Sequence, residues 1–147
     1  MEKIIISAVD DSHIPTRAHD TDAWFDVRAR DNYIIPAKGM INIPIWVKVA
    51  MPNGMVCLVF PRSSLPLKKG LVLANSVGVV DAWYRGEIHM QLYNLSDREV
   101  IIEHNEKIGQ LLFMNYSSDV EISPKYNSFE EEYPSDRGTG WFGSTWN

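Results

Sequence analysis

The sequence predicts an all-β fold, a barrel or a sandwich built from many short strands. Several segments alternate apolar and polar residues, which is the period of a strand with one buried face. Short apolar runs of strand length accompany them, and clusters of turn-forming residues separate these segments. Many short strands divided by turns are typical of sandwiches and barrels.

The clearest alternation is at 41–49, where every odd position is aliphatic and a single strand is expected. Pro44 cannot donate a ladder hydrogen bond, so we expect this strand to lie at a sheet edge or to be bulged. In 87–94, three apolar residues share one face, Ile88, Met90 and Leu92. Further strands are predicted at 4–7, 56–60, 99–103 and 108–113, and the only helix is predicted at 63–69.

Length and charge narrow the function classes. The chain has 147 residues, a net charge of −5 and a pI near 5.3. A protein that binds long nucleic acid usually carries a basic surface, so we expect no such partner, although a few local cations can still hold a small anion. No apolar run approaches the roughly 20 residues that span a bilayer, and the N-terminus does not resemble a signal peptide. We expect a soluble, intracellular protein without a membrane partner.

The single cysteine, Cys57, lies within an apolar run and is expected to be a small buried hydrophobe. The composition changes near the C-terminus, where 117–136 is polar and acidic and a Gly-rich tail follows. We therefore expect one β domain, a barrel or a sandwich, at 1–116, and a polar connector with an arm that orders over a ligand at 117–147.

The segment 78–86 suggests a sugar-binding hairpin. Asp81 follows two β-branched residues, and Tyr84 and Gly86 come shortly after it. An aromatic face beside a carboxylate suits a sugar, and Gly86 is expected to permit a tight turn with positive φ. Taken alone, an ordinary hairpin with a turn aspartate remains the better explanation.

Three other segments carry polar groups suited to a nucleotide. Arg62, Ser63 and Ser64 follow an apolar strand and can bind phosphate oxygens, or simply begin a capped helix. In the tail, Arg137 can reach a terminal phosphate and Phe142 can stack on a base. Asp26 and Gln110 are weak signals when each is considered alone.

Together these segments resemble the five ordered motifs of the trimeric dUTPase family, and the resemblance covers nearly the whole chain. The matching segments are 23–29 around Asp26, Pro61–Ser64, Asn75–Gly86, Ile108–Leu111 and Arg137–Thr145. The resemblance implies a dUTPase-like β-barrel of jelly-roll (β-clip) type and a homotrimer with sites between subunits. It also implies a flexible Gly-rich C-terminal arm that covers a site built by other subunits.

The family's chemistry implies that dUTP is hydrolysed to dUMP and pyrophosphate by water attack on the α-phosphorus, which keeps uracil out of DNA. Asp81 would hold the 3′-hydroxyl and orient or deprotonate the water, and Tyr84 would exclude a 2′-hydroxyl. Mg²⁺ would bridge the triphosphate, held by phosphates and water with Asp26 in its outer shell. The remaining implied substrate-binding residues are Arg62, Ser63, Ser64, Asn75, Val79, Val80, His89, Gln110, Arg137, Phe142 and Gly143. The location implied is the cytoplasm, or the interior of an infected cell for a viral enzyme.

Four tryptophans depart from the family pattern: Trp24, Trp83, Trp141 and Trp146. Trp141 adjoins Phe142, where it either adds a stacking surface or hinders closure of the arm. Two alternatives remain beside hydrolysis. One is a non-catalytic nucleotide-binding or regulatory protein on the same scaffold. The other is a dCTP deaminase relative, which needs a general-base glutamate in its site.

Overall fold

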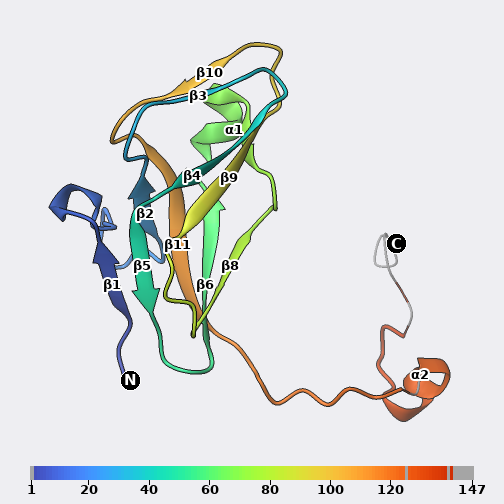
Figure 1. Cartoon of the computed structure of the whole chain (residues 1–147). Helices are drawn as coiled ribbons and strands as arrows, with labels where there is room; N and C mark the ends of the chain where they lie inside the picture. Colours follow the sequence, from blue (N-terminus) through green and yellow to red (C-terminus); the bar gives the residue numbers. More distant parts are fainter. Residues whose placement is uncertain (1, 125, 139, 141–147) are drawn as a thin grey trace. The chain divides into compact units, whose positions relative to one another are not determined.

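A computed structural model of the chain describes residues 2–124, 126–138 and 140. They belong to two compact units, Met1–Ser117 and Ser118–Asn147, which are described separately. In the described part of the chain, all strands lie in the first unit (Figure 1). The predicted all-β fold class is therefore confirmed.

Antiparallel pairing organises the strands of the first unit into four sheets within the described residues. The largest sheet runs in the order β2 (Phe25–Arg28), β11 (Lys107–Asn115), β6 (Met55–Pro61) and β8 (Gly78–Asp81). A second runs in the order β4 (Met40–Pro44), β9 (His89–Asn94) and β7 (Leu71–Leu73). Two pairs complete the set, β1 (Ile5–Ala8) with β5 (Val47–Ala50) and β3 (Tyr33–Ile35) with β10 (Val100–Ile102).

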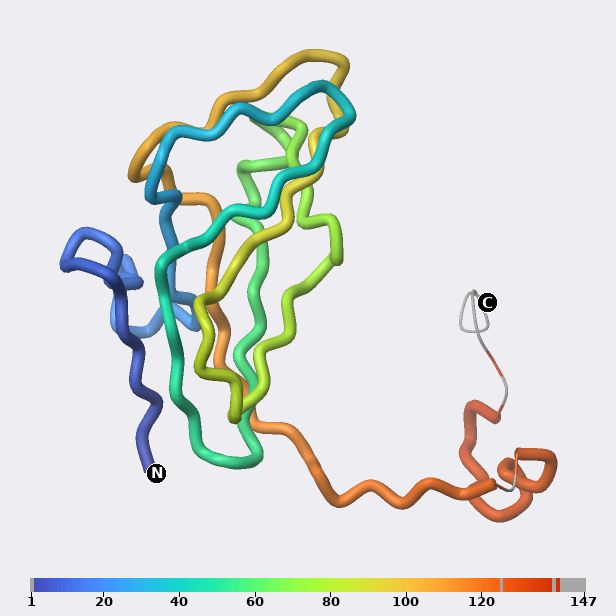
Figure 2. Tube along the Cα trace, in the orientation of Figure 1, coloured from blue at the N-terminus to red at the C-terminus, as the bar shows by residue number. Residues whose placement is uncertain are grey.

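The sheets enclose one core of mostly aliphatic side chains. Figure 2 traces the path of the chain through these sheets. The predicted apolar face of 87–94 is confirmed, because Ile88, Met90 and Leu92 are all buried. Cys57 is fully buried as well, and this burial raises the pKa of its thiol to about 12. Its predicted role as a small core residue is confirmed.

The single strand predicted at 41–49 is wrong. The chain leaves the second sheet at Pro44 and joins the β1–β5 pair at Val47, although the alternation of buried residues continues across the break. Trp46 lies at the point where the chain changes sheets. Its φ of 59° is a left-handed conformation that is unusual for a bulky residue. The expectation for Pro44 is confirmed, because β4 is an edge strand.

The predicted helix at 63–69 is present as α1, Ser64–Lys69. It ends at Gly70, whose φ of 65° suits a left-handed C-cap and whose backbone N–H returns to the carbonyl of Pro66. Figure 1 places α1 near the β3–β10 pair, and Lys69 Nζ donates a hydrogen bond to the carbonyl of Ile101 in β10.

Asn94 ties the end of β9 to neighbouring loops. Its side chain is fully buried, and its amide nitrogen lies 2.8–3.1 Å from the carbonyl oxygens of Ile35, Pro36 and Arg98. Its carbonyl oxygen accepts hydrogen bonds from the backbone N–H and the hydroxyl of Ser96. A buried amide is tolerated here because both of its polar ends are satisfied.

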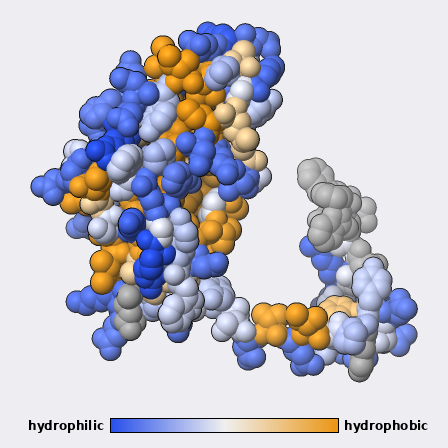
Figure 3. Space-filling view, in the orientation of Figure 1, coloured by the Kyte–Doolittle hydropathy of each residue, from blue (hydrophilic) through white to orange (hydrophobic). Residues whose placement is uncertain are grey.

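The second unit contains a short helix that the sequence analysis missed, α2 at Phe129–Glu132. It follows a 3₁₀ turn at Tyr126–Ser128, and a four-residue helix leaves too short a pattern to detect. The rings of Phe129 and Tyr133 pack at a centroid distance of 5.1 Å. Apolar side chains are also exposed before α2, where Val120 and Ile122 lie, as Figure 3 shows along the connector.

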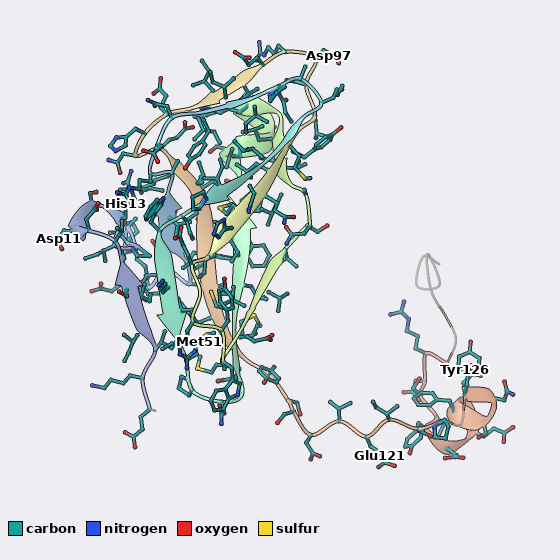
Figure 4. All side chains as sticks on the ribbon, viewed as in Figure 1. Asp11, His13, Met51, Asp97, Glu121 and Tyr126 are labelled. Carbon is teal, nitrogen blue, oxygen red and sulfur yellow. The ribbon has the colours of Figure 1, made fainter. Side chains whose placement is uncertain are left out.

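A second short 3₁₀ turn, Asp11–His13, follows β1, and His13 is labelled there in Figure 4. The carboxylate of Asp10 caps this turn by accepting hydrogen bonds from Ser12 and His13. Among the helices that the structure describes, none is long and apolar enough to cross a membrane.

Candidate active site

A cavity of about 240 Å³ opens between β8, the following loop and the start of β9. Six of the residues proposed from the sequence line it, Asn75, Val79, Val80, Asp81, Tyr84 and His89. The structure therefore brings together the residues of 75–89 that were expected to bind base and sugar. Asp81 ends β8 and is exposed, so its carboxylate is available to a ligand.

The loop after Asp81 is a tight turn closed by local hydrogen bonds. The backbone N–H of Tyr84 donates to the carbonyl of Asp81 at 3.0 Å, and the Tyr84 hydroxyl donates to the carbonyl of Glu87 at 2.8 Å. The guanidinium of Arg85 donates to the carbonyl of Ala82. These bonds hold the Tyr84 ring against the loop that leads into β9.

Glycine at position 86 is required for a reason other than the one expected. The prediction of a positive φ at Gly86 is wrong, since the described glycines with positive φ are Gly54, Gly70 and Gly138. A Cβ atom at Gly86 would instead overlap the ring and hydroxyl of Tyr84. Gly86 therefore leaves space for the aromatic ring rather than relieving backbone strain.

Gly78, at the start of β8, is tightly packed against β6. A Cβ atom at this position would lie 2.9 Å from Cβ of Val59. Before it, Ser76 adopts a φ of 65° in the turn that carries Asn75 into the cavity. Sequence reasoning missed Glu87, which lines the cavity; its position directly after the Tyr-Arg-Gly turn was the available signal.

A second group contains the residues expected to bind phosphates. Arg62 follows β6, and its backbone N–H donates to the carbonyl of Ile108 at the start of β11. Ser63 occupies the N-cap position of α1, yet its side chain makes no capping hydrogen bond. Its hydroxyl is thus not committed to the helix, which contradicts the capping role considered from the sequence.

Gln110 and Asp26 face each other across the β11–β2 ladder. The amide nitrogen of Gln110 lies 3.4 Å from Oδ1 of Asp26, and Lys107 Nζ lies 2.7 Å from Oδ2. Burial alone would raise the pKa of Asp26, but the hydrogen bonds from Lys107 and Gln110 and the nearby charges of Lys107 and Arg62 lower it below 3.8. Asp26 is therefore a carboxylate at neutral pH.

The two groups are far apart within one chain. Asp81 pairs with Val56 near one end of β6, whereas Arg62 follows the other end, six residues further along. At a rise of ~3.3 Å per residue, the Cα atoms of Asp81 and Arg62 are roughly 20 Å apart. An arginine side chain does not span this distance, so one chain does not bring both residues to the same phosphorus atom.

In the second unit, Arg137 turns back on its own segment, where its Nε donates to the carbonyl of Gly140 at 2.9 Å. Gly138 has a φ of 53°, a backbone conformation that favours glycine. Phe142 and Gly143, both expected to bind substrate, lie outside the described residues, as do Trp141 and Trp146.

The two remaining departures from the family pattern have different surroundings. The Trp24 ring packs edge-on against Phe60, with ring centroids 5.1 Å apart. Trp83 is 78% exposed and lines a separate hollow with the loop around Met51, which is labelled in Figure 4. Trp24 therefore contributes to packing, whereas Trp83 does not line the cavity.

Comparison with known proteins agrees with the geometry. A family model described as dUTPase matches residues 10–146. The chain is 44% identical to the deoxyuridine 5′-triphosphate nucleotidohydrolase of Corynebacterium jeikeium, over 90% of this chain and 84% of that protein. It is 32% identical to the same enzyme of Dictyoglomus turgidum, over 99% of both chains.

Among solved structures, dUTPase from Streptococcus mutans matches with a TM-score of 0.72 and 33% identity, over 82% of this chain and 98% of that one. The dUTPase of Staphylococcus bacteriophage 80alpha shares the fold with a TM-score of 0.81, at 22% identity over 99% of both chains. The match along nearly the whole sequence and the shared fold together show that this chain belongs to the dUTPase family.

Proposed function

We propose that the protein hydrolyses dUTP to dUMP and pyrophosphate. The observation that carries this proposal is the cavity in which Asp81 and Tyr84 lie together at the end of β8. The relatives named above are deoxyuridine triphosphate nucleotidohydrolases, and the phage 80alpha dUTPase has been solved with dUpNHpp bound.

In this proposal, the exposed carboxylate of Asp81 orients a water molecule for attack on the α-phosphorus and accepts its proton. Such a water must lie roughly 3–3.5 Å from the phosphorus, which requires the sugar to be held firmly. The Tyr84 ring supplies a flat apolar face to the deoxyribose and leaves no space for a 2′-hydroxyl. The β8–β9 backbone, with Asn75, Val79, Val80 and His89, reads the base.

Arg62, Ser63, Ser64 and Gln110 would bind the phosphates, because a guanidinium, hydroxyls and an amide donate to phosphate oxygens. The roughly 20 Å between Asp81 and Arg62 in one chain supports a site built from more than one copy. We therefore propose a homotrimer, in which the phosphate-binding residues of one subunit face the 78–86 hairpin of another subunit. Arg137, Phe142 and Gly143 of an arm would cover the bound nucleotide.

The residues fit a magnesium ion that is held mainly by the substrate. In the part of the chain that the structure describes, no cluster of three or more acidic, histidine or cysteine residues can hold a metal. Mg²⁺ keeps several waters and favours phosphate oxygens, so Asp26 is suited to accept a hydrogen bond from a metal-bound water. When bound, the ion would neutralise charge on the triphosphate.

The enzyme is proposed to act in the cytoplasm, or inside the infected cell for a viral protein; the single buried cysteine suits a reducing compartment. Release of pyrophosphate from dUTP, compared with dCTP, dTTP and UTP, tests the function. No observation favours the non-catalytic or the deaminase alternative. Retained dUTP binding without any turnover would support the first, and ammonia release from dCTP would support the second.

A further inference from the structure

Two neighbouring charged residues lie where β11 begins, Glu106 just before the strand and Lys107 as its first residue, and each pairs with a different element. Glu106 Oε2 lies 2.8 Å from Nζ of Lys69 at the end of α1. Lys107 Nζ lies 2.7 Å from Oδ2 of Asp26 in β2. The two ion pairs are similar in length and both are partly buried, but only the second includes a residue, Asp26, that also accepts a hydrogen bond from Gln110.

A β-bulge brings Lys107 to Asp26. The ladder between β11 and β2 pairs Lys107 with Arg28 but Gly109 with Val27, so β11 contains one extra residue. Without the bulge, Lys107 and Gln110 would point to opposite faces of the strand, because they are three positions apart. With it, both side chains reach the same carboxylate, at 2.7 and 3.4 Å.

The bulge is tightly packed. A Cβ atom at Gly109 would lie 2.5 Å from Sδ of Met90 and 3.0 Å from the carbonyl oxygen of Phe60. Ile108 is fully buried on the core side, while Lys107 and Gln110 remain partly exposed. The local backbone thus has a defined geometry, which determines the direction of both polar side chains.

The negative charge of Asp26 lies near the residues expected to bind phosphates and must be compensated. Asp26 is negatively charged and lies close enough to Arg62 for the two charges to interact. An uncompensated carboxylate beside Arg62 and Gln110 would repel a triphosphate bound there. The ammonium of Lys107 offsets the negative charge of Asp26 and donates a hydrogen bond to its Oδ2. The other carboxylate oxygen, Oδ1, then faces the Gln110 amide.

We propose that Lys107 is a positioning residue for the triphosphate, acting through Asp26 to orient Gln110 and to neutralise the carboxylate beside the phosphate-binding group. The inference rests on the proposed function of that group as the phosphate site. Lys107 itself need not contact substrate.

Replacing Lys107 by Met tests this role, because the change removes the ammonium and keeps an apolar stem. We expect KM for dUTP and Kd for a non-hydrolysable dUTP analogue to rise about tenfold, while kcat changes less than about threefold. Lys107→Arg should restore both values to within about threefold, since a guanidinium also reaches the carboxylate. Lys69→Met is the matched control: it breaks the neighbouring ion pair, and KM should stay unchanged.

A double-mutant cycle shows whether Lys107 acts through Asp26. In an Asp26→Asn background, Lys107→Met should raise Kd for the analogue less than twofold. A full tenfold rise in that background would overturn the inference, as would equal losses of affinity and equal falls in Tm in Lys107→Met and Lys69→Met. Because Kd is measured without turnover, a wild type that binds the analogue but does not hydrolyse dUTP would contradict the proposed function and not the role of Lys107.

Discussion

The hydroxyl of Tyr84 donates a hydrogen bond to the carbonyl oxygen of Glu87 over 2.8 Å. This bond holds the ring against the loop that joins β8 to β9. The ring lies in the space that a Cβ atom of residue 86 would occupy, and Gly86 leaves this space free. The orientation of the proposed sugar-binding ring therefore depends on one hydrogen bond and one glycine.

We expect Gly86→Ala to displace the Tyr84 ring and to reduce kcat/KM for dUTP at least tenfold. The new Cβ would overlap the ring, while the φ of this residue requires no glycine. Steady-state kinetics with dUTP, beside a Tm measurement, check the prediction. Tyr84→Phe is the control: it keeps the ring and loses one exposed hydrogen bond, worth about 1 kcal/mol, so a smaller effect is expected. Unchanged kinetics in Gly86→Ala would contradict the role given to the ring.

We expect the thiol of Cys57 to resist modification in the folded protein. Burial raises its pKa from 9.0 to about 12, so at pH 8 the side chain is a protonated thiol away from solvent. Between pH 9 and 12 the folded protein keeps the thiol proton that the unfolded chain loses. The free energy of unfolding is therefore unaffected by this group below pH 9 and falls as pH rises from 9 toward 12.

A thiol reagent added at pH 8 should modify less than about a tenth of Cys57 in the time that it fully modifies the urea-unfolded chain. Cys57→Ser provides the blank for the assay. Equal rates for folded and unfolded protein would show that Cys57 is not held in the core.

We expect two inactive variants to restore activity when their subunits are mixed. Asp81 and Arg62 are roughly 20 Å apart within one chain, so each proposed site takes them from different subunits. Asp81→Asn and Arg62→Ala should each abolish turnover as homotrimers. Unfolding and refolding them together should produce mixed trimers that contain intact sites and recover a clear fraction of the wild-type activity.

The unmixed variants, refolded separately and then combined, are the control for that exchange experiment. A mixture that stays inactive, although mass measurement shows mixed trimers, would place both residues in a single subunit's site. It would then contradict the intersubunit arrangement and leave hydrolysis itself untouched.

Much of the fold follows from local patterns, because a period of two and turn residues locate the strands. Alternation could not reveal that the chain changes sheets at Trp46, since the buried odd positions continue from Ile45 to Val47. Helix α2 was missed because four residues give no usable period.

The site was less predictable than the fold. Motif order predicted Asp81 and Tyr84, which line one cavity, but the contact of Lys107 with Asp26 joins residues 81 positions apart and depends on a bulge in the ladder. Neither feature has a local sequence signal. Gly86 was identified correctly as a required glycine, but the cause is the neighbouring ring rather than the backbone angle.

The most direct test measures pyrophosphate release from dUTP, dCTP, dTTP and UTP by the wild type and by Asp81→Asn, each in the presence of Mg²⁺. The wild type should hydrolyse dUTP and show little activity on the other three nucleotides. Asp81→Asn should lose at least about a hundredfold in kcat while still binding the dUTP analogue, because its carboxylate is the proposed base. A wild-type trimer without dUTP turnover, or an Asp81→Asn variant with full turnover, would contradict the account.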